Sequence, residues 1–325
     1  MSRRDRAAIL LYLCVAVSLA FVDHRVRREQ FRGHVLSEYV PSVLAGTSGA
    51  PAKYRVLMPY GLAALTERVA GDPYIVFLVV EYVAILISLL VLHWYLRTWF
   101  DVGASLGGVL GLAAFVPLTF TNTWAHPDTF PDLALFTLGC LAIARRHDIG
   151  FASVLAVGMF NRETMGFLVL LWGALRLPER KREDWVRFAG YLAIAGTIFV
   201  GLRWARGLEH YRMFMLGENL RMLEILPAGF DPFTRVFGYF WLVLLAVPGW
   251  LAVSGCRAAG APPFFRAAVA VSLVYLSVVW VFAAIAETRV LLPILALLLP
   301  AALSNFAPVT SSRVPGAGPP GNPTR

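Results

Sequence analysis

The sequence predicts an all-α membrane protein, a polytopic bundle of about nine to ten transmembrane helices with a long first extracytoplasmic loop. Hydrophobic residues make up 58% of the 325 residues and charged residues 15%, whereas soluble domains carry about 25% charged residues. Several apolar runs are long enough to cross a bilayer as helices. These runs do not alternate between polar and apolar residues, which argues against a transmembrane β-barrel. One bundle over residues 1–304 and a disordered Pro/Gly-rich tail over 305–325 account for the composition.

The first half of the chain divides into two spans separated by a polar segment. We expect an uncleaved first span at 7–22 with its N-terminus in the cytoplasm, and then an outer loop over 23–72. Within that loop Leu57–Val69 is expected to form a short interfacial helix. The second span, 73–96, contains Glu81, a carboxyl group that needs a partner or a proton inside a membrane. Further spans are expected at 102–120, 133–144, 188–204, 236–253, 267–286 and 290–303.

A polar tetrad, Asn161–Thr164, interrupts the apolar run from 149 to 175. Basic clusters at 145–146 and 180–182 flank this run, and basic clusters at the ends of spans tend to stay in the cytoplasm. Both flanks then lie on one side, and the run forms a hairpin with the tetrad at its tip. The alternative is one tilted span in which an arginine and a glutamate pair internally.

Under this topology the ionisable and aromatic polar side chains gather on one face of the bundle. The outer segments are 23–72, 121–132 and 204–235, together with the hairpin tip and a tight turn at 287–289. Ligand sites are concavities into which a few polar groups converge, and arginine binds phosphate bidentately. The sequence therefore predicts a polar site at the non-cytoplasmic end of an apolar bundle.

Three short stretches, YRVLMP (54–59), NRET (161–164) and ETRVLLP (287–293), resemble those of bacterial membrane proteins grouped near the GT-C superfamily. The first span followed by a long outer loop with an acid near its start also resembles that superfamily. The similarity covers residues 1–305. It implies a multi-pass protein of the bacterial inner membrane that transfers a sugar from a polyprenyl-phosphate carrier to an acceptor on the extracytoplasmic face.

The resemblance also implies roles for individual residues. Asp23 matches the first-loop acid that serves as general base, and Asp128 would be a second catalytic acid. The paired-acid signature of the superfamily is not complete, because His24 follows Asp23. The side chains expected to bind substrate, with arginines holding the lipid phosphate, are His24, Tyr54, Arg55, His126, Asn161, Arg162, Glu163, Glu287 and Arg289.

Partners and cofactors follow from charge and residue usage. The net charge of +9 suits contact with anionic lipid, and no basic tract interleaved with aromatic residues indicates nucleic acid. Cys14, Cys140 and Cys256 lack the spacing of a metal site, so no metal ligand is predicted, and dependence on a divalent metal stays open. The expected partners are membrane lipid and a polyprenyl-phosphate-linked sugar.

Two other function classes remain open. A small-solute transporter or lipid flippase would show internal repeats and broken helices, but only one interrupted segment, at Asn161, is visible in the sequence. A non-catalytic assembly subunit would use the polar face to dock a protein partner.

Overall fold

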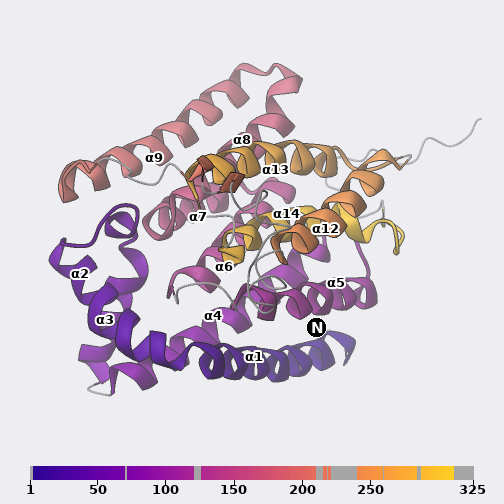
Figure 1. Cartoon of the computed structure of the whole chain (residues 1–325). Coiled ribbons are helices and arrows are strands. Elements are labelled where there is room, and N and C mark those ends of the chain that lie inside the picture. Colours follow the sequence, from indigo (N-terminus) through magenta and orange to yellow (C-terminus); the bar gives the residue numbers. More distant parts are fainter. Residues whose placement is uncertain are drawn as a thin grey trace, which may run out of the picture.

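The computed structural model describes residues 3–69, 72–120, 126–209, 215–217, 219–220, 240–258, 260–283 and 287–310. Within these ranges all regular elements are helices (Figure 1). The elements follow in the order α1 (Arg3–Gln30), η1 (Phe31–Tyr39), α2 (Val40–Ala45), η2 (Ala52–Tyr54), α3 (Leu57–Val69), α4 (Pro73–Leu96), α5 (Val102–Phe115), η3 (Val116–Thr119), α6 (Thr129–Ala144), α7 (Asp148–Asn161), η4 (Glu163–Gly166), α8 (Phe167–Arg176), η5 (Leu177–Glu179), α9 (Arg182–Arg206), α12 (Phe240–Arg257), α13 (Pro263–Phe282), η6 (Thr288–Leu291) and α14 (Leu292–Leu303).

Five helical stretches in the described chain are long and apolar enough to cross a membrane. They are Asp5–Ala45, Pro73–Leu96, Val102–Thr119, Arg182–Arg206 and Pro263–Phe282. The prediction of an all-helical chain with apolar helices of membrane length is confirmed at this level. The expected tail beyond residue 310, residues 121–125 and the greater part of 204–235 lie outside the described residues.

The first helical segment is much longer than expected. The predicted loop over 23–72 is wrong for its first half, because α1 runs on through the π-helix η1 into α2, which ends at Gly46 with φ 71°. The physical reason is that no glycine or proline occurs before Gly33, so no helix breaker ends α1 near residue 22. Gly33 lies within η1, and Pro41 stands in the first turn of α2, where proline is tolerated. The expected helix Leu57–Val69 is present as α3.

The predicted hairpin is present. Trp172 Nε1 of α8 donates a hydrogen bond to Asp148 Oδ1 at the start of α7, at 3.3 Å, so the chain returns toward the start of α7 after the tetrad. At its tip α7 ends at Asn161, and Arg162 is extended with φ −160° and ψ 136°. Gly158 allows the turn to close, since a Cβ there would lie 2.5 Å from Met165 Cε. The run from 149 to 175 is therefore not one continuous helix.

The centre of the bundle consists of α4, α6 and α14, with α1 on one side and α9 on the other (Figure 1). Residues 290–298 of α14 and the end of η6 are all buried. Helix α12 approaches α14 closely at Gly255, where a Cβ would lie 1.9 Å from the Ala301 carbonyl oxygen. This packing brings the start of α6, the tip of the hairpin and the start of η6 to the same end of the bundle.

Candidate functional site

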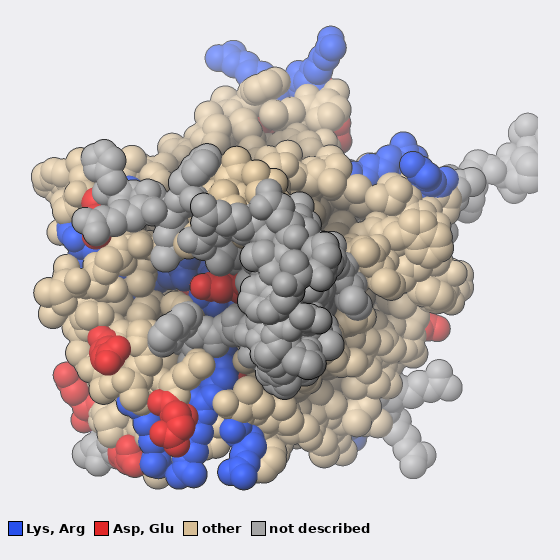
Figure 2. All heavy atoms as spheres, in the orientation of Figure 1, with Lys and Arg blue, Asp and Glu red and all other residues tan. Residues whose placement is uncertain are grey.

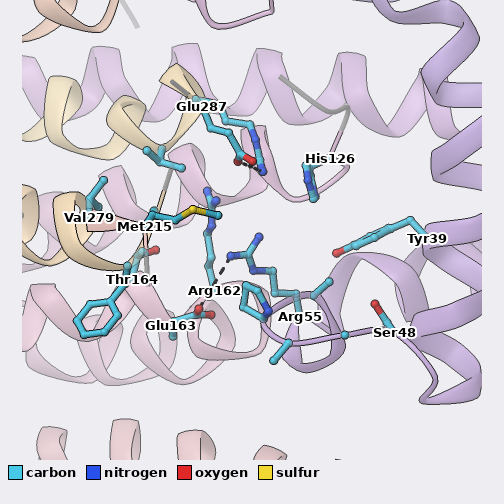
Figure 3. A pocket seen from close by; sticks show the side chains of 18 of the residues that line it. Tyr39, Ser48, Arg55, His126, Arg162, Glu163, Thr164, Met215, Val279 and Glu287 are labelled. Atoms are coloured by element: carbon cyan, nitrogen blue, oxygen red, sulfur yellow. Dashed lines mark hydrogen bonds and ion pairs between the residues drawn. The ribbon is translucent and has the colours of Figure 1, made fainter. Parts of the chain in front are cut away.

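A cavity of about 620 Å³ lies at this end of the bundle. Its walls come from η1 and α2, the segment 47–55, the hairpin tip, the end of α13 and η6. Figure 2 shows acidic and basic side chains together in a hollow on this face. The close-up shows Tyr39, Arg55 and Arg162 pointing toward the middle of the cavity (Figure 3).

Four buried side chains form the floor of the site, and we call them the cavity cluster: Arg55, Asp128, Asp132 and Arg162. Asp128 Oδ2 lies 3.3 Å from Arg55 Nη1 and 3.6 Å from Arg162 Nε. Arg162 Nη1 donates to Asp132 Oδ2 at 3.1 Å. Two guanidinium groups and two carboxylates balance in charge, which is the arrangement that makes buried ions tolerable.

Local structure explains how these groups meet. Asp128 and Asp132 are four residues apart at the start of α6, so both carboxylates lie on one side of the first turn, where the helix dipole favours negative charge. The extended backbone at Arg162 carries its side chain from the hairpin tip across to both of them. Asn161 fixes the approach, since its Nδ2 donates to the Asp128 carbonyl oxygen at 3.3 Å.

Arg289 has more unused hydrogen-bonding capacity than Arg55 and Arg162, each of which leaves only its Nε without a hydrogen-bond partner among the described residues. Its Nη2 donates to Glu287 Oε2 at 2.6 Å, but Nε and Nη1 have no hydrogen-bond partner among the described residues. The side chain is only 3% exposed and lines the cavity. The buried hydroxyl of Tyr39, also on the cavity wall, likewise has no hydrogen-bond partner among the described residues. Buried donors are normally satisfied, so these groups indicate where a ligand or ordered water binds.

The electrostatics of the floor fix the protonation of two groups. Burial would raise the pKa of Asp128, but Arg55 and then Arg162 outweigh it and hold the pKa below its usual value, so the group is a carboxylate. Burial, followed by the charge of Arg289, lowers the pKa of His126 well below its usual value, and Asp128 opposes this only in part. His126 is therefore a neutral imidazole, with Nδ1 3.7 Å from Asp128 Oδ1.

The opposite wall of the cavity is apolar. Phe167 at the start of α8 and Val278, Val279 and Phe282 at the end of α13 form it. Val278 and Phe282 are 39% and 46% exposed, so the apolar wall continues onto the outer surface of α13. The cavity thus combines cationic donors with hydrocarbon, as a ligand with an anionic head and an apolar tail requires.

The structure brings together most of the predicted site residues. Arg55, His126, Arg162, Glu163, Glu287 and Arg289 line the cavity. Asp128 and Asn161 lie directly beneath it. Asp128 pairs with Arg55 and Arg162, and Asn161 donates a hydrogen bond to the backbone of Asp128.

The three remaining predicted residues belong neither to the wall nor to the floor of the cavity. Asp23 is fully buried in α1 and pairs with Arg27, and His24 contacts the Tyr74 hydroxyl. Tyr54 donates its hydroxyl proton to the Gly207 carbonyl oxygen at 3.0 Å. The expectation that Asp23 and His24 open an outer loop is wrong, because α1 continues past them.

Several residues of the site were not predicted from the sequence. Asp132 and Tyr39 are the clearest cases, and Glu38 and His34 line the same wall as Tyr39. The four-residue spacing from Asp128 could have indicated Asp132. No local signal could have indicated the other three, because they reach the cavity only through the continuation of α1 into η1.

No cluster of three or more His, Cys, Asp or Glu side chains with the geometry of a metal site occurs within the described part of the chain. Comparison with protein-family models, with curated proteins and with solved structures found no match. The function is therefore argued from the geometry of the cavity.

Proposed function

We propose that the chain is a multi-pass protein of the bacterial inner membrane, with about nine to ten crossings. We further propose that it transfers a sugar from a polyprenyl-phosphate carrier to an acceptor on the extracytoplasmic face. One observation carries the proposal: the cavity is lined both by the unpaired N–H groups of Arg289 and by an apolar wall that extends to the surface of α13. A lipid phosphate presents both kinds of surface at once.

The hairpin supports the proposed placement of the cavity in the membrane. Its arms contain 14 and 10 residues, or about 21 and 15 Å of helix, against a hydrocarbon core of about 30 Å. With both basic flanks in the cytoplasm, the tip would stop between the middle of the bilayer and its outer half. The cavity above the tip would then open toward the outer surface, where the phosphate of a lipid carrier lies.

The chemistry requires stabilisation of the leaving group. When the bond between the sugar carbon and the phosphate oxygen breaks, the electron pair stays on the phosphate, which departs as polyprenyl phosphate. Donors already in position at the developing charge lower the barrier. Arg289 has the most donors to spare, because two of its N–H groups lack a hydrogen-bond partner, whereas Arg55 and Arg162 each leave only Nε without one.

The acceptor hydroxyl must lose its proton to a base as it attacks the sugar. Asp128 is poorly suited, since two arginines stabilise its ionised form, and Asp23 does not reach the cavity. Glu38 and Glu163 are better placed. Glu163 Oε1 lies 3.9 Å from Arg55 Nη2, and the exposed Glu38 Oε2 lies 3.0 Å from His34 Nδ1. The proposal gives the role of base to one of these two glutamates.

Binding of the carrier tests the proposal first. Protein in lipid nanodiscs is titrated with undecaprenyl phosphate and, as a matched probe, with undecaprenol, which has the same tail and no phosphate. We expect binding of the phosphate and at least tenfold weaker binding of the alcohol. Arg289→Gln should remove most of this difference. The control Arg187→Gln changes an exposed ion pair at the other end of the hairpin and should preserve it.

Transfer is then distinguished from transport with the radiolabelled lipid-linked sugars of the source cells. Release of polyprenyl phosphate with label in an acceptor supports a glycosyltransferase. Movement of the intact lipid-linked sugar across the bilayer identifies a flippase instead. Equal binding of the phosphate and the alcohol would contradict a lipid-phosphate site and leave an assembly subunit as the better explanation.

A further inference from the structure

A second group of buried ionisable side chains lies between α1 and α4, and we call it the α1–α4 cluster: Asp23, Arg27 and Glu81. Asp23 and Arg27 are one turn apart on α1, and Arg27 Nε and Nη2 donate to the two carboxylate oxygens of Asp23. Glu81 of α4 lies beside the Asp23 carboxyl group, within reach of a hydrogen bond. None of the three residues is more than 8% exposed.

Aromatic rings seal this cluster. The Arg27 guanidinium lies 5.3 Å from the centre of the Phe31 ring and 5.0 Å from that of Phe120. Phe31 in turn packs against Phe77, with 4.9 Å between ring centres. The Asp23 carboxylate is therefore removed from water and held between α1, α4 and the residue that follows η3.

The other ionisable groups near α1 and α4 are engaged elsewhere. His24 contacts the hydroxyl of Tyr74, which belongs to α4. The two carboxylates at the start of α6, Asp128 and Asp132, pair with arginines of the cavity cluster. Asp23 and Arg27 are the charged side chains beside Glu81. Two carboxyl groups thus share one guanidinium.

A surplus negative charge without water or a partner is very costly to bury. Two carboxyl groups can also form a hydrogen bond with each other only if one of them carries a hydrogen atom. We propose that the α1–α4 cluster holds one proton, carried by Glu81 and directed at Asp23, which makes the cluster electrically neutral.

The geometry assigns the proton to Glu81. Both oxygens of Asp23 accept hydrogen bonds from Arg27, as expected of a carboxylate. Glu81 Oε2 has no hydrogen-bond partner among the described residues. An unpartnered oxygen is far less costly on a neutral carboxylic acid than on a carboxylate. Glu81 then donates to Asp23, which donates nothing.

The position of this proton links it to the cavity. The backbone of α1 departs from helical geometry at Arg27, with φ −116° and ψ 17°, just before η1 begins. Helix η1 carries His34, Glu38 and Tyr39 to the cavity wall. The proton therefore stabilises the contact between α1 and α4 next to the bend at Arg27, and this bend sets the direction of η1 and of the cavity wall that η1 forms. Its loss would place two carboxylates in contact and push the two helices apart.

Infrared spectroscopy of the full chain in lipid tests the proposal, because a protonated carboxylic acid has a carbonyl stretch that a carboxylate lacks. We expect this band at neutral pH and its loss in Glu81→Gln, which is neutral without a proton. Asp23→Asn is the second variant: it leaves one glutamate and one arginine, which balance, and should also lose the band. Glu183→Gln, at an exposed position, is the control and should keep it.

The pH dependence of unfolding gives an independent measurement. If the folded chain binds one proton that the unfolded chain releases, the free energy of unfolding falls as pH rises. We expect this fall in the natural chain and a flatter profile in both variants. Loss of the band in either variant together with the flatter profile supports the proposal. An unchanged band in both variants, or profiles identical to that of the natural chain, would overturn it.

Discussion

The cavity cluster and the α1–α4 cluster consist of the same kinds of side chain but differ in charge balance and surroundings. The cavity cluster has two arginines for two aspartates and lies under an open cavity. The α1–α4 cluster has one arginine for two carboxyl groups and lies under aromatic rings. The first is balanced and stands beside unused donors of Arg289, whereas the second needs a proton and offers no space to a ligand.

This difference shows why ionisable residues in an apolar chain do not by themselves define one site. Asp23 and Asp128 look alike in the sequence, because each lies near the end of an apolar run and close to a histidine. His24 directly follows Asp23, and His126 lies two residues before Asp128. In the structure the first connects two helices, and the second holds two arginines under a cavity. The two aspartates differ in role because the charges around Asp128 balance and adjoin a cavity, whereas those around Asp23 do neither.

The largest expected effect is that of Arg162→Gln. This change leaves Asp132 without its guanidinium and Asp128 with one instead of two. Removing one partner of a buried ion pair costs about 3–5 kcal/mol. We expect a loss of that size in the free energy of unfolding, measured by titrating sodium dodecyl sulfate into mixed micelles.

The matched control for this change is the double variant Asp132→Asn with Arg162→Gln. It removes one charge of each sign, so part of the lost stability should return. If Arg162→Gln alone unfolds at the same detergent fraction as the natural chain, the cavity cluster does not support the fold in the way its geometry indicates.

A smaller effect distinguishes the two clusters by pH. His126 has a lowered pKa in the folded chain, so below about pH 6.5 the unfolded chain binds a proton that the folded chain resists. Stability is then lost as pH falls. Asp128, whose pKa is also lowered, adds to this loss at lower pH. The α1–α4 cluster should lose stability in the opposite direction, as pH rises.

We therefore expect His126→Gln to flatten the acid side of the stability profile and Glu81→Gln to flatten the alkaline side. Thermal unfolding of each variant across a pH series provides the measurement. An acid side that is equally steep with and without the imidazole would show that His126 accepts a proton freely in the folded chain.

Much of the fold could be predicted from the sequence because local rules determine it. The helix boundaries Leu57–Val69 and Pro73–Leu96 are as expected, with Asp72 capping the second helix through the Tyr74 N–H. The hairpin followed from the positions of basic residues around an apolar run. Each of these features depends on composition, turn residues or charge near one segment, which the sequence displays directly.

The site was only partly predictable because it depends on how helices meet. That Asp132 and Asp128 both pair with Arg162 requires the hairpin tip to reach the start of α6. That Glu81 finds Asp23 requires a particular register of α1 against α4. Because a loop was expected after residue 22, Asp23 was predicted at the outer face and not between two helices. For the same reason Tyr39 was not predicted as a residue of the cavity. Contacts between distant segments leave no local pattern to read.

The smallest expected effect is at the base of the hairpin, where Arg187 Nη1 lies 2.9 Å from Asp148 Oδ2. This distance is shorter than those from Asp128 to its arginines, yet both partners are partly exposed. Exposed ion pairs contribute about 0–1 kcal/mol and weaken with salt. Arg187→Gln should therefore change the free energy of unfolding by less than about 1 kcal/mol, and less again at high salt. A loss as large as that of Arg162→Gln would mean that distance, and not burial, determines the strength of ion pairs in this protein.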